Sequence, residues 1–172
     1  MTVCPRGYWG RVQREPATEM RERLAGEISG EARRRGLTVA VAESLTGGMV
    51  ATALAAAEAA SEWFRGSLVA YSSEVKHAVL DVPDGPVVSA EAAEAMAAGV
   101  RRLLGADVAV AVTGSGGPST QDGKDPGTVY VAVDAGSGTL VQRLDLDGEP
   151  GEICADSAEH TLRLLLNGVK CA

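Results

Sequence analysis

The stretch VAVAESLTGG at residues 39–48 constrains the fold more than any other part of the chain. It opens with small and β-branched apolar residues, a composition typical of a strand that is buried on both faces. A polar turn with two glycines follows, and the alanine-rich segment 49–55 then has the character of a helix. A buried strand that leads through a short turn into a helix is a unit of open α/β sheets, whose ligands bind at the carboxyl ends of the strands.

The composition restricts the core to small side chains. The chain has 172 residues but only two Trp, three Tyr and one Phe, so Ala, Val and Leu must fill the interior. Such a core suits helices that pack closely on a parallel sheet. The length is that of one domain with its own core. We therefore expect a single domain over residues 17–172, preceded by a flexible extension at residues 1–16.

Hydrophobic patterns and turn signals predict the remaining elements. Helices are expected at 18–35, 49–55, 72–80, 89–104 and 150–166, with Gly168 just past the end of the last one. Strands are expected at 39–43, 66–71, 108–112, 128–133 and 139–144. This order predicts a three-layer α/β/α domain with a mixed, mostly parallel sheet, which is parallel where helices intervene and antiparallel at the hairpin around residues 136–138.

Charge, cysteine usage and hydropathy exclude several classes of function. A net charge of −7 argues against a general nucleic-acid or anionic-membrane surface. Cys4, Cys154 and Cys171 form no C-x-x-C pair, and His77 and His160 lack metal-ligand spacing, so we expect neither a disulfide framework nor a metal site. Neither a long apolar run nor a signal-peptide core is present, so we expect no membrane span and a cytoplasmic location.

Three of the predicted strands end in polar turns, at residues 43–48, 71–76 and 113–118. If these strands are parallel neighbours, the turns meet at one edge of the sheet. They would then bring together the Ser44 hydroxyl, the Lys76 amine and the Tyr71 phenol beside clustered backbone N–H groups. Further hydroxyls of these turns belong to Thr46, Thr113 and Ser115.

This set contains the parts for covalent acyl transfer. Ser44 is a weak nucleophile unless a base removes its proton, and neither histidine lies in a suitable turn. A lysine can replace histidine as the base if burial or nearby positive charge lowers its pKa. The alternative is that Ser44 or Thr46 only caps a helix and that Lys76 is a solvated surface charge. The residues alone leave both interpretations open.

Several segments in combination resemble the CinA C-terminal domain family, whose enzymatic members are nicotinamide mononucleotide deamidases. The segments, which span much of residues 20–166, are AESLTGG (42–48), WFRG (63–66), YSSEVK (71–76), VTG (112–114) and PGTVY (126–130). Each is short, but their order and spacing together are specific.

The resemblance implies hydrolysis of nicotinamide mononucleotide to nicotinate mononucleotide and ammonia. By position, Ser44 matches the nucleophile, Lys76 the base and Tyr71 an assisting residue. The resemblance also implies that no metal or cofactor takes part and that the chain forms a homo-oligomer, a dimer or a trimer. The residues placed at or around the small-molecule nucleotide substrate are Glu43, Thr46, Gly47, Thr113, Gly114, Ser115 and Gly116.

The chain departs from the family pattern at four places. Ser73 stands where members usually carry Asn, and Ser115-Gly116 stands for a larger apolar residue followed by Ala. The usual Gly-Asp-Arg before the last helix is Gly148-Glu149-Pro150, and Cys154 coincides with an expected arginine. Lys124, Arg143 or an N-terminal arginine is left as the cation for a phosphate. Two alternatives follow: a catalytically silent binding or assembly domain, or a hydrolase of a different amide.

Overall fold

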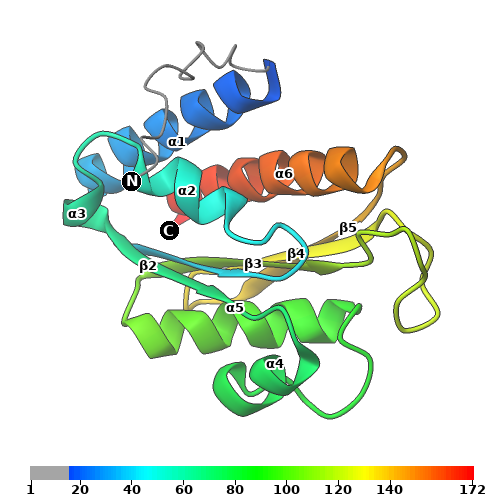
Figure 1. The fold of residues 1–172 in the computed structure, drawn as a ribbon. Coiled ribbons are helices and arrows are strands. Elements are labelled where there is room, and N and C mark those ends of the chain that lie inside the picture. The colour runs from blue at the N-terminus through cyan, green and yellow to red at the C-terminus, as the bar shows by residue number, and fades with distance from the viewer. Residues whose placement is uncertain (1–15) are drawn as a thin grey trace, which may run out of the picture.

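A mixed β-sheet forms the middle layer of the protein (Figure 1). The computed structural model describes residues 16–172, in which the sheet has five strands: β1 (Val39–Glu43), β2 (Phe64–Val69), β3 (Val108–Gly114), β4 (Thr128–Asp134) and β5 (Thr139–Asp145). Their order across the sheet is β2-β1-β3-β4-β5. β1 pairs in parallel with β2 and β3, whereas β4 pairs antiparallel with β3 and β5. The carboxyl ends of β2, β1 and β3 therefore lie at one edge.

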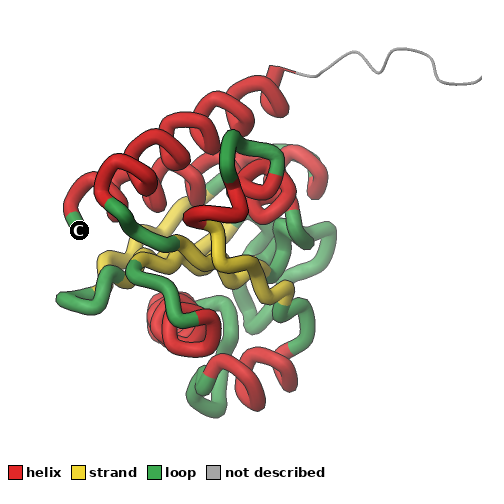
Figure 2. The backbone as a smooth tube through the Cα atoms, turned by 90° about the vertical axis from the view of Figure 1, so that its left-hand side faces the viewer, coloured by secondary structure: helices red, strands yellow, loops and turns green. Residues whose placement is uncertain are grey.

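Helices cover both faces of this sheet (Figures 1 and 2). Within the described residues they are α1 (Pro16–Arg35), α2 (Met49–Ala55), α3 (Ala60–Trp63), α4 (Ser73–Leu80), α5 (Ala90–Leu104) and α6 (Pro150–Cys171). α1, α2 and α6 lie on one side of the sheet, while α4 and α5 lie on the other. The three-layer α/β/α prediction is confirmed. The flexible extension expected at 1–16 lies outside the described residues, apart from Pro16, which begins α1.

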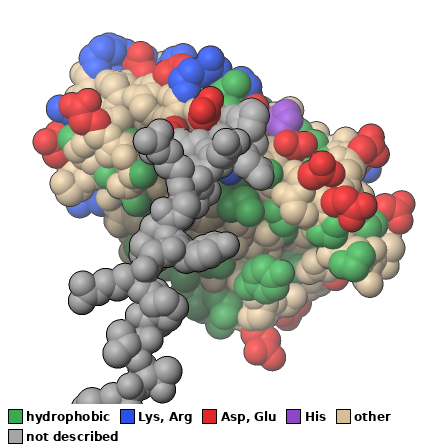
Figure 3. Space-filling view, turned by 45° about the horizontal axis from the view of Figure 1, so that its top comes forward, with side chains coloured by type: hydrophobic (Ala, Val, Ile, Leu, Met, Phe, Trp, Pro, Cys, Tyr) green, Lys and Arg blue, Asp and Glu red, His purple; other side chains and the backbone are tan. Residues whose placement is uncertain are grey.

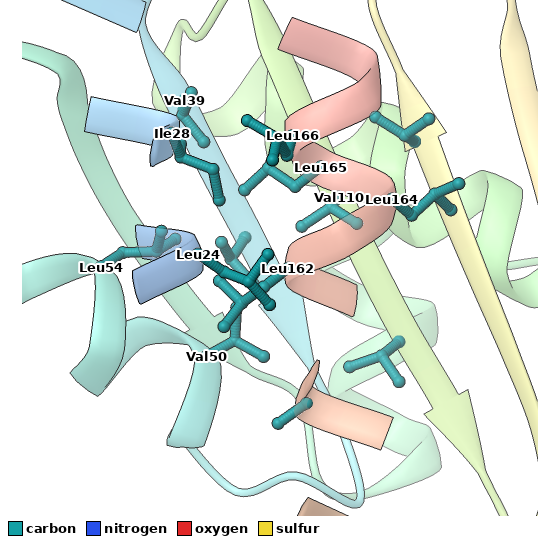
Figure 4. Packing of buried hydrophobic residues seen from close by; sticks show 14 of the residues in the cluster. Leu24, Ile28, Val39, Val50, Leu54, Val110, Leu162, Leu164, Leu165 and Leu166 are labelled. Carbon is teal, nitrogen blue, oxygen red and sulfur yellow. The ribbon is translucent and has the colours of Figure 1, made fainter. Parts of the chain in front are cut away.

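Alternating valine and alanine in β1 and β3 give the two faces of the sheet different packing. Every residue of both strands is buried, as their apolar runs predicted. Val39 and Val41 join the core beneath α1 and α6, and Figure 4 shows leucines of both helices against this valine face. Ala40 and Ala42 join the second core beneath α5. Because alanine projects little, α5 can lie close to the sheet.

Close packing continues outward from α5 to α4. At Gly99 of α5, a Cβ atom would lie 2.4 Å from the carbonyl oxygen of Leu80, the last residue of α4. No side chain fits there without a shift of the backbone, so glycine permits the contact. Because α4 carries Lys76, the position of Lys76 depends on this contact.

β2 begins and ends two residues earlier than predicted. Trp63 is buried just before it and donates from Nε1 to the carbonyl oxygen of Glu58, 3.2 Å away. At its other end Ser72 caps α4 by accepting from the backbone N–H of Val75, so the chain has already left the sheet. Tyr71 therefore lies in the turn, with an exposed side chain.

The prediction that α6 ends near Leu166 is wrong, because the helix continues to Cys171 with Gly168 inside it. The glycine serves close packing: a Cβ at Gly168 would lie 2.6 Å from Cγ2 of Val133 on β4. A glycine stop signal and a glycine at a tight helix–sheet contact look the same in the sequence.

This contact predicts that Gly168→Ala destabilises the protein. The added methyl group overpacks the α6–β4 contact, and we expect the free energy of unfolding to fall by about 1–3 kcal/mol. Gly30→Ala in α1 is the matched control, because no atom lies within 4 Å of the added carbon. It should raise stability by up to about 1 kcal/mol. Urea unfolding measures both, and an equal response of the two variants would contradict the packing argument.

Candidate functional site

The turn that carries Ser44 is fixed by the carboxylate of Glu43. Glu43 is fully buried, and its oxygens accept from the Thr46 hydroxyl (2.7 Å) and from three backbone N–H groups at the start of α2 (2.8–3.1 Å). The backbone N–H of Ser44 donates to the carbonyl of Val112 on β3 (3.1 Å). Glu43 and Thr46 therefore hold the turn together from beneath.

Glu43→Gln should weaken this turn. The amide keeps the shape but offers an –NH2 group where a backbone N–H already points, so one buried donor loses its acceptor. We expect a loss of about 1–3 kcal/mol in the free energy of unfolding. Glu58→Gln removes a carboxylate from an exposed pair with Arg33 and should cost about 1 kcal/mol or less. If urea unfolding ranks the two variants in the opposite order, Glu43 does not hold the turn.

Lys76 is buried on α4, the helix that follows the second turn. Its side chain is 0% exposed, and Nζ donates to the backbone carbonyl of Tyr71, 3.3 Å away. Burial lowers the pKa of this amine, and the negative charge of Asp122 opposes part of that change. A lysine is rarely enclosed in this way. The solvated-surface interpretation of Lys76 is therefore excluded by its burial.

β3 extends to Gly114, two residues beyond the predicted strand, so Thr113 lies in β3 and the third turn begins at Ser115. Thr113 is buried and donates from Oγ1 to the carbonyl of Val87 (2.7 Å). Ser115 is also buried, and its backbone groups pair with residues 127 and 128 at the start of β4. These bonds join the end of β3 to the segment around Val87 and to the start of β4.

The sequence analysis missed Asp122, which lies in the loop between β3 and β4. Its carboxylate accepts from the backbone N–H groups of Val87 (2.7 Å) and Val88 (3.0 Å), tethering this loop across the end of the sheet. Its backbone is left-handed, with φ of 52°. The Asp122-Gly123 pair was a turn signal, but only the fold brings the carboxylate toward Lys76.

A pocket of about 520 Å³ opens at this edge of the sheet. Of the sequence-predicted site residues, Ser44, Tyr71, Gly114 and Gly116 line it. Lys76 is not among the lining residues, but its amine is hydrogen-bonded to the carbonyl of Tyr71, which is. Gly47 instead lines a separate groove between α1 and α2. The other lining residues are Leu45, Gly117, Pro118, Ser119, Thr120, Gln121, Pro150 and Cys154.

Backbone N–H groups in this pocket are available to a ligand. Leu45 and Gly116 lie side by side, with 3.6 Å between the Leu45 Cβ and the place of a Cβ on Gly116. Within residues 16–172 their N–H groups make no hydrogen bond. Cys154 adjoins them and donates from Sγ to the Leu45 carbonyl (3.1 Å), and burial raises the pKa of its thiol. Free N–H groups beside a hydroxyl suit an oxyanion.

Residues 16–172 contain neither a candidate metal cluster nor a candidate membrane span. Among residues 16–172, no three His, Cys, Asp or Glu side chains are grouped so that they could hold a metal ion. None of the helices in the described part is long and apolar enough to cross a membrane.

The sequence matches the CinA C-terminal domain over residues 21–169. It is 41% identical over 151 residues to a CinA-like protein of Myxococcus xanthus, covering 84% of this chain and 36% of that protein. A CinA-like protein of Frankia casuarinae is 39% identical over 154 residues, with 85% and 36% covered. The chain thus spans about a third of the length of these relatives.

Solved structures that share this fold are also CinA-type proteins. A competence damage-inducible protein A from Klebsiella pneumoniae superimposes with a TM-score of 0.82 at 31% identity, covering 86% of this chain and 95% of that one. A CinA superfamily protein from Escherichia coli gives a TM-score of 0.82 at 29% identity, covering 91% and 94%. The fold is thus that of the CinA superfamily. The chain belongs to the CinA C-terminal domain family.

Proposed function

We propose that this chain is an amidohydrolase that uses Ser44 as nucleophile and Lys76 as base to hydrolyse the carboxamide of a pyridine compound. The reaction implied by the family resemblance converts nicotinamide mononucleotide to nicotinate mononucleotide and ammonia. The observation that carries the proposal is the burial of Lys76, which is 0% exposed and whose Nζ donates to the backbone carbonyl of Tyr71 on the wall of the Ser44 pocket.

The first half of the reaction forms an ester on Ser44. A neutral Lys76 amine takes the hydroxyl proton while Oγ attacks the carbonyl carbon of the amide. Negative charge then develops on the carbonyl oxygen, and the free N–H groups of Leu45 and Gly116 donate hydrogen bonds to it. Lys76 returns its proton to the leaving nitrogen, the C–N bond breaks, and ammonia departs.

The second half of the reaction releases the acid. Water attacks the ester carbonyl and gives a proton to Lys76, and the bond to Ser44 Oγ breaks. Lys76 then returns the proton to that oxygen, so both side chains regain their starting state. Tyr71 contributes its backbone carbonyl, which fixes the amine of Lys76. The cycle needs neither an oxidant nor a metal.

The proposal is tested by incubating the purified chain with nicotinamide mononucleotide and following both ammonia and nicotinate mononucleotide. Acid quenching during turnover, followed by peptide mass spectrometry, should find the nicotinoyl ester on the peptide that contains Ser44. Product without any acyl-enzyme on Ser44 would contradict the covalent route. Binding of the amide without release of ammonia would favour the silent binding domain instead. The cytoplasmic location and the homo-oligomer stay predictions.

A further inference from the structure

The loop between β3 and β4 forms one wall of the Ser44 pocket, and a single carboxylate fastens it. Residues 116–121 of this loop line the pocket. The next residue, Asp122, accepts from the backbone N–H groups of Val87 (2.7 Å) and Val88 (3.0 Å). Both valines are buried, and within residues 16–172 their N–H groups have no other acceptor. Loss of this oxygen would leave two N–H groups of buried residues without a partner.

The turn that presents this carboxylate suits an aspartate. Gln121 and Lys124 exchange two backbone hydrogen bonds (2.9 and 3.1 Å), so Asp122 and Gly123 form a two-residue turn between them. The φ angles of the pair are 52° and 70°. Both are positive, as in a type I′ turn, in which Asn-Gly and Asp-Gly are favoured pairs. An asparagine at this position therefore keeps the turn, and its amide oxygen can accept the same hydrogen bonds.

The segment that Asp122 holds is also joined to Lys76. It follows α4 directly, and the N–H of Val82 donates to the backbone carbonyl of Lys76 (3.2 Å). Farther along, the carbonyl of Val87 accepts from Thr113 Oγ1 at the end of β3 (2.7 Å). Asp122 therefore lies where the pocket wall, the end of β3 and the segment after α4 meet.

The charge of Asp122 acts on the Lys76 amine. Burial lowers the pKa of this amine, and the carboxylate of Asp122 opposes that change. Water screens part of the effect, because Asp122 is exposed. The Nδ1 atom of His77 on α4 lies 2.8 Å from the carbonyl oxygen of Val82. The remaining ionisable side chains of α4, α5 and the segments at either end of α4 are either exposed, as are Tyr71, Glu74, Asp84, Glu91 and Glu94, or paired, as Arg102 is with Asp81 and Arg101 with Asp134.

We propose that Asp122 is a positioning residue of the Ser44–Lys76 pair: its carboxylate fixes the pocket wall and stabilises the ammonium that forms when Lys76 takes the Ser44 proton. The inference rests on the proposed function, since it adds a residue to the same reaction. Asp122 stays ionised throughout, because the proton moves from Ser44 Oγ to Lys76 Nζ and then to the leaving nitrogen. An amine is a stronger base when a carboxylate lies near its charged form.

Asp122→Asn tests the charge, because it keeps the turn and an oxygen acceptor. We expect the pH of half-maximal ammonia release to fall, since the Lys76 ammonium loses a stabilising charge. The plateau of kcat at high pH should fall about 3-fold, because a weaker base takes the Ser44 proton more slowly. A midpoint that is unchanged or higher in this variant would overturn the inference.

Asp122→Gly is the second variant, and it removes the charge together with both hydrogen bonds. Glycine adopts a φ of 52° without strain, so the turn is kept. We expect the same fall in the midpoint, with a larger loss of kcat/KM because the pocket wall is no longer fastened. A lower rate with an unmoved midpoint would mean that Asp122 only supports the loop, and the proposed effect on the base would be wrong.

Asp125→Asn is the matched control, and it is needed because this end of the molecule is acidic. Acidic side chains gather on the side where α6 begins and where the loop between β3 and β4 projects (Figures 1 and 3). Exposed carboxylates near the start of α6 belong to Asp145, Asp147, Glu149, Glu152 and Asp156. Asp125 is exposed in the same loop as Asp122, and its charge does not shift the pKa of Lys76. Asp125→Asn should leave midpoint and plateau unchanged, and a shift as large as that of Asp122→Asn would overturn the inference.

Lys76 can also be titrated without turnover. The chain has three lysines, Lys76, Lys124 and Lys170, so lysine labelled with carbon-13 at Cε gives one NMR signal for each, and Lys76→Met identifies the signal of Lys76. In Asp122→Asn this signal should titrate at lower pH than in the unmodified chain. Titration at the same pH in both proteins overturns the inference. If no ammonia is released above the background of Ser44→Ala, the hydrolase proposal is wrong, while this titration still decides whether Asp122 acts on the amine.

Discussion

Ser44→Ala is expected to lower the rate of ammonia release by at least about 100-fold, since loss of the nucleophile removes the covalent path. The substitution removes one oxygen atom from a side chain that lines the pocket, and it leaves the Ser44 N–H bond to Val112 in place. The fold should therefore be kept. The measurement is kcat/KM for ammonia release from nicotinamide mononucleotide, with circular dichroism of both proteins.

Ser119→Ala is the matched control for this prediction. Ser119 also lines the pocket, but it lies in the loop after β3, and its backbone carbonyl rather than its hydroxyl accepts from Ser115. We expect its rate to stay within about 3-fold of the unmodified chain, as for a side chain outside the reacting group. If both serine variants lost activity equally, the pocket and not the Ser44 hydroxyl would set the rate.

Lys76→Met should cost nearly as much activity as Ser44→Ala, because a nucleophile and its base act as a unit. Methionine keeps much of the volume of the buried lysine stem but has no amine. Lys76→Arg should be equally inactive, since a guanidinium stays protonated and takes no proton. A Lys76→Met protein that keeps its fold and its full rate would remove Lys76 from the mechanism.

The rate of ammonia release should increase with pH. Burial lowers the pKa of Lys76, and only the neutral amine accepts a proton. Activity should rise through this lowered pKa and level off below about 10.4, the ordinary value for lysine. The Ser44-dependent rate of Lys76→Met should lack this rise. A rate that is flat between about pH 6 and 9 would argue against Lys76 as the base.

Stability should change with pH in the same direction. In the window between the lowered pKa of folded Lys76 and the ordinary value near 10.4, the unfolded chain holds the proton and the folded chain does not. The unfolded state then binds more protons, so the free energy of unfolding rises with pH across that window. Below the window the buried ammonium costs stability in full. Lys76→Met should flatten this dependence in urea unfolding.

The layers and most elements could be predicted because their signals are local. The apolar runs of β1 and β3 predicted buried strands, and Ser89 predicted the start of α5, where its hydroxyl accepts from Ala92. The end of α6 was predicted wrongly at Gly168, because a helix stop and a close packing contact both favour glycine. α3 was not predicted, since its four residues are too short for a helical period.

The site could be predicted only in part, for a physical reason. Ser44 directly follows β1, while Tyr71 and then α4 with Lys76 follow the neighbouring parallel strand β2, so strand order brings both segments to the same end of the sheet. Burial is a property of the finished fold, so neither the enclosure of Lys76 nor the inward direction of Glu43 could be inferred from their neighbours in the sequence. Asp122 reaches this region from a loop, and the course of a loop cannot be inferred from hydrophobic periodicity.

The absence of a side chain at Gly99 has a consequence that extends beyond the packing of two helices. The last turn of α4 rests on that bare backbone, and the same short helix carries the amine of Lys76. In the proposed reaction, the position of the Lys76 amine is therefore set from behind its helix, by a residue that does not line the pocket. We expect a larger side chain at position 99 to displace α4, and Lys76 with it, while every residue of the pocket wall stays the same.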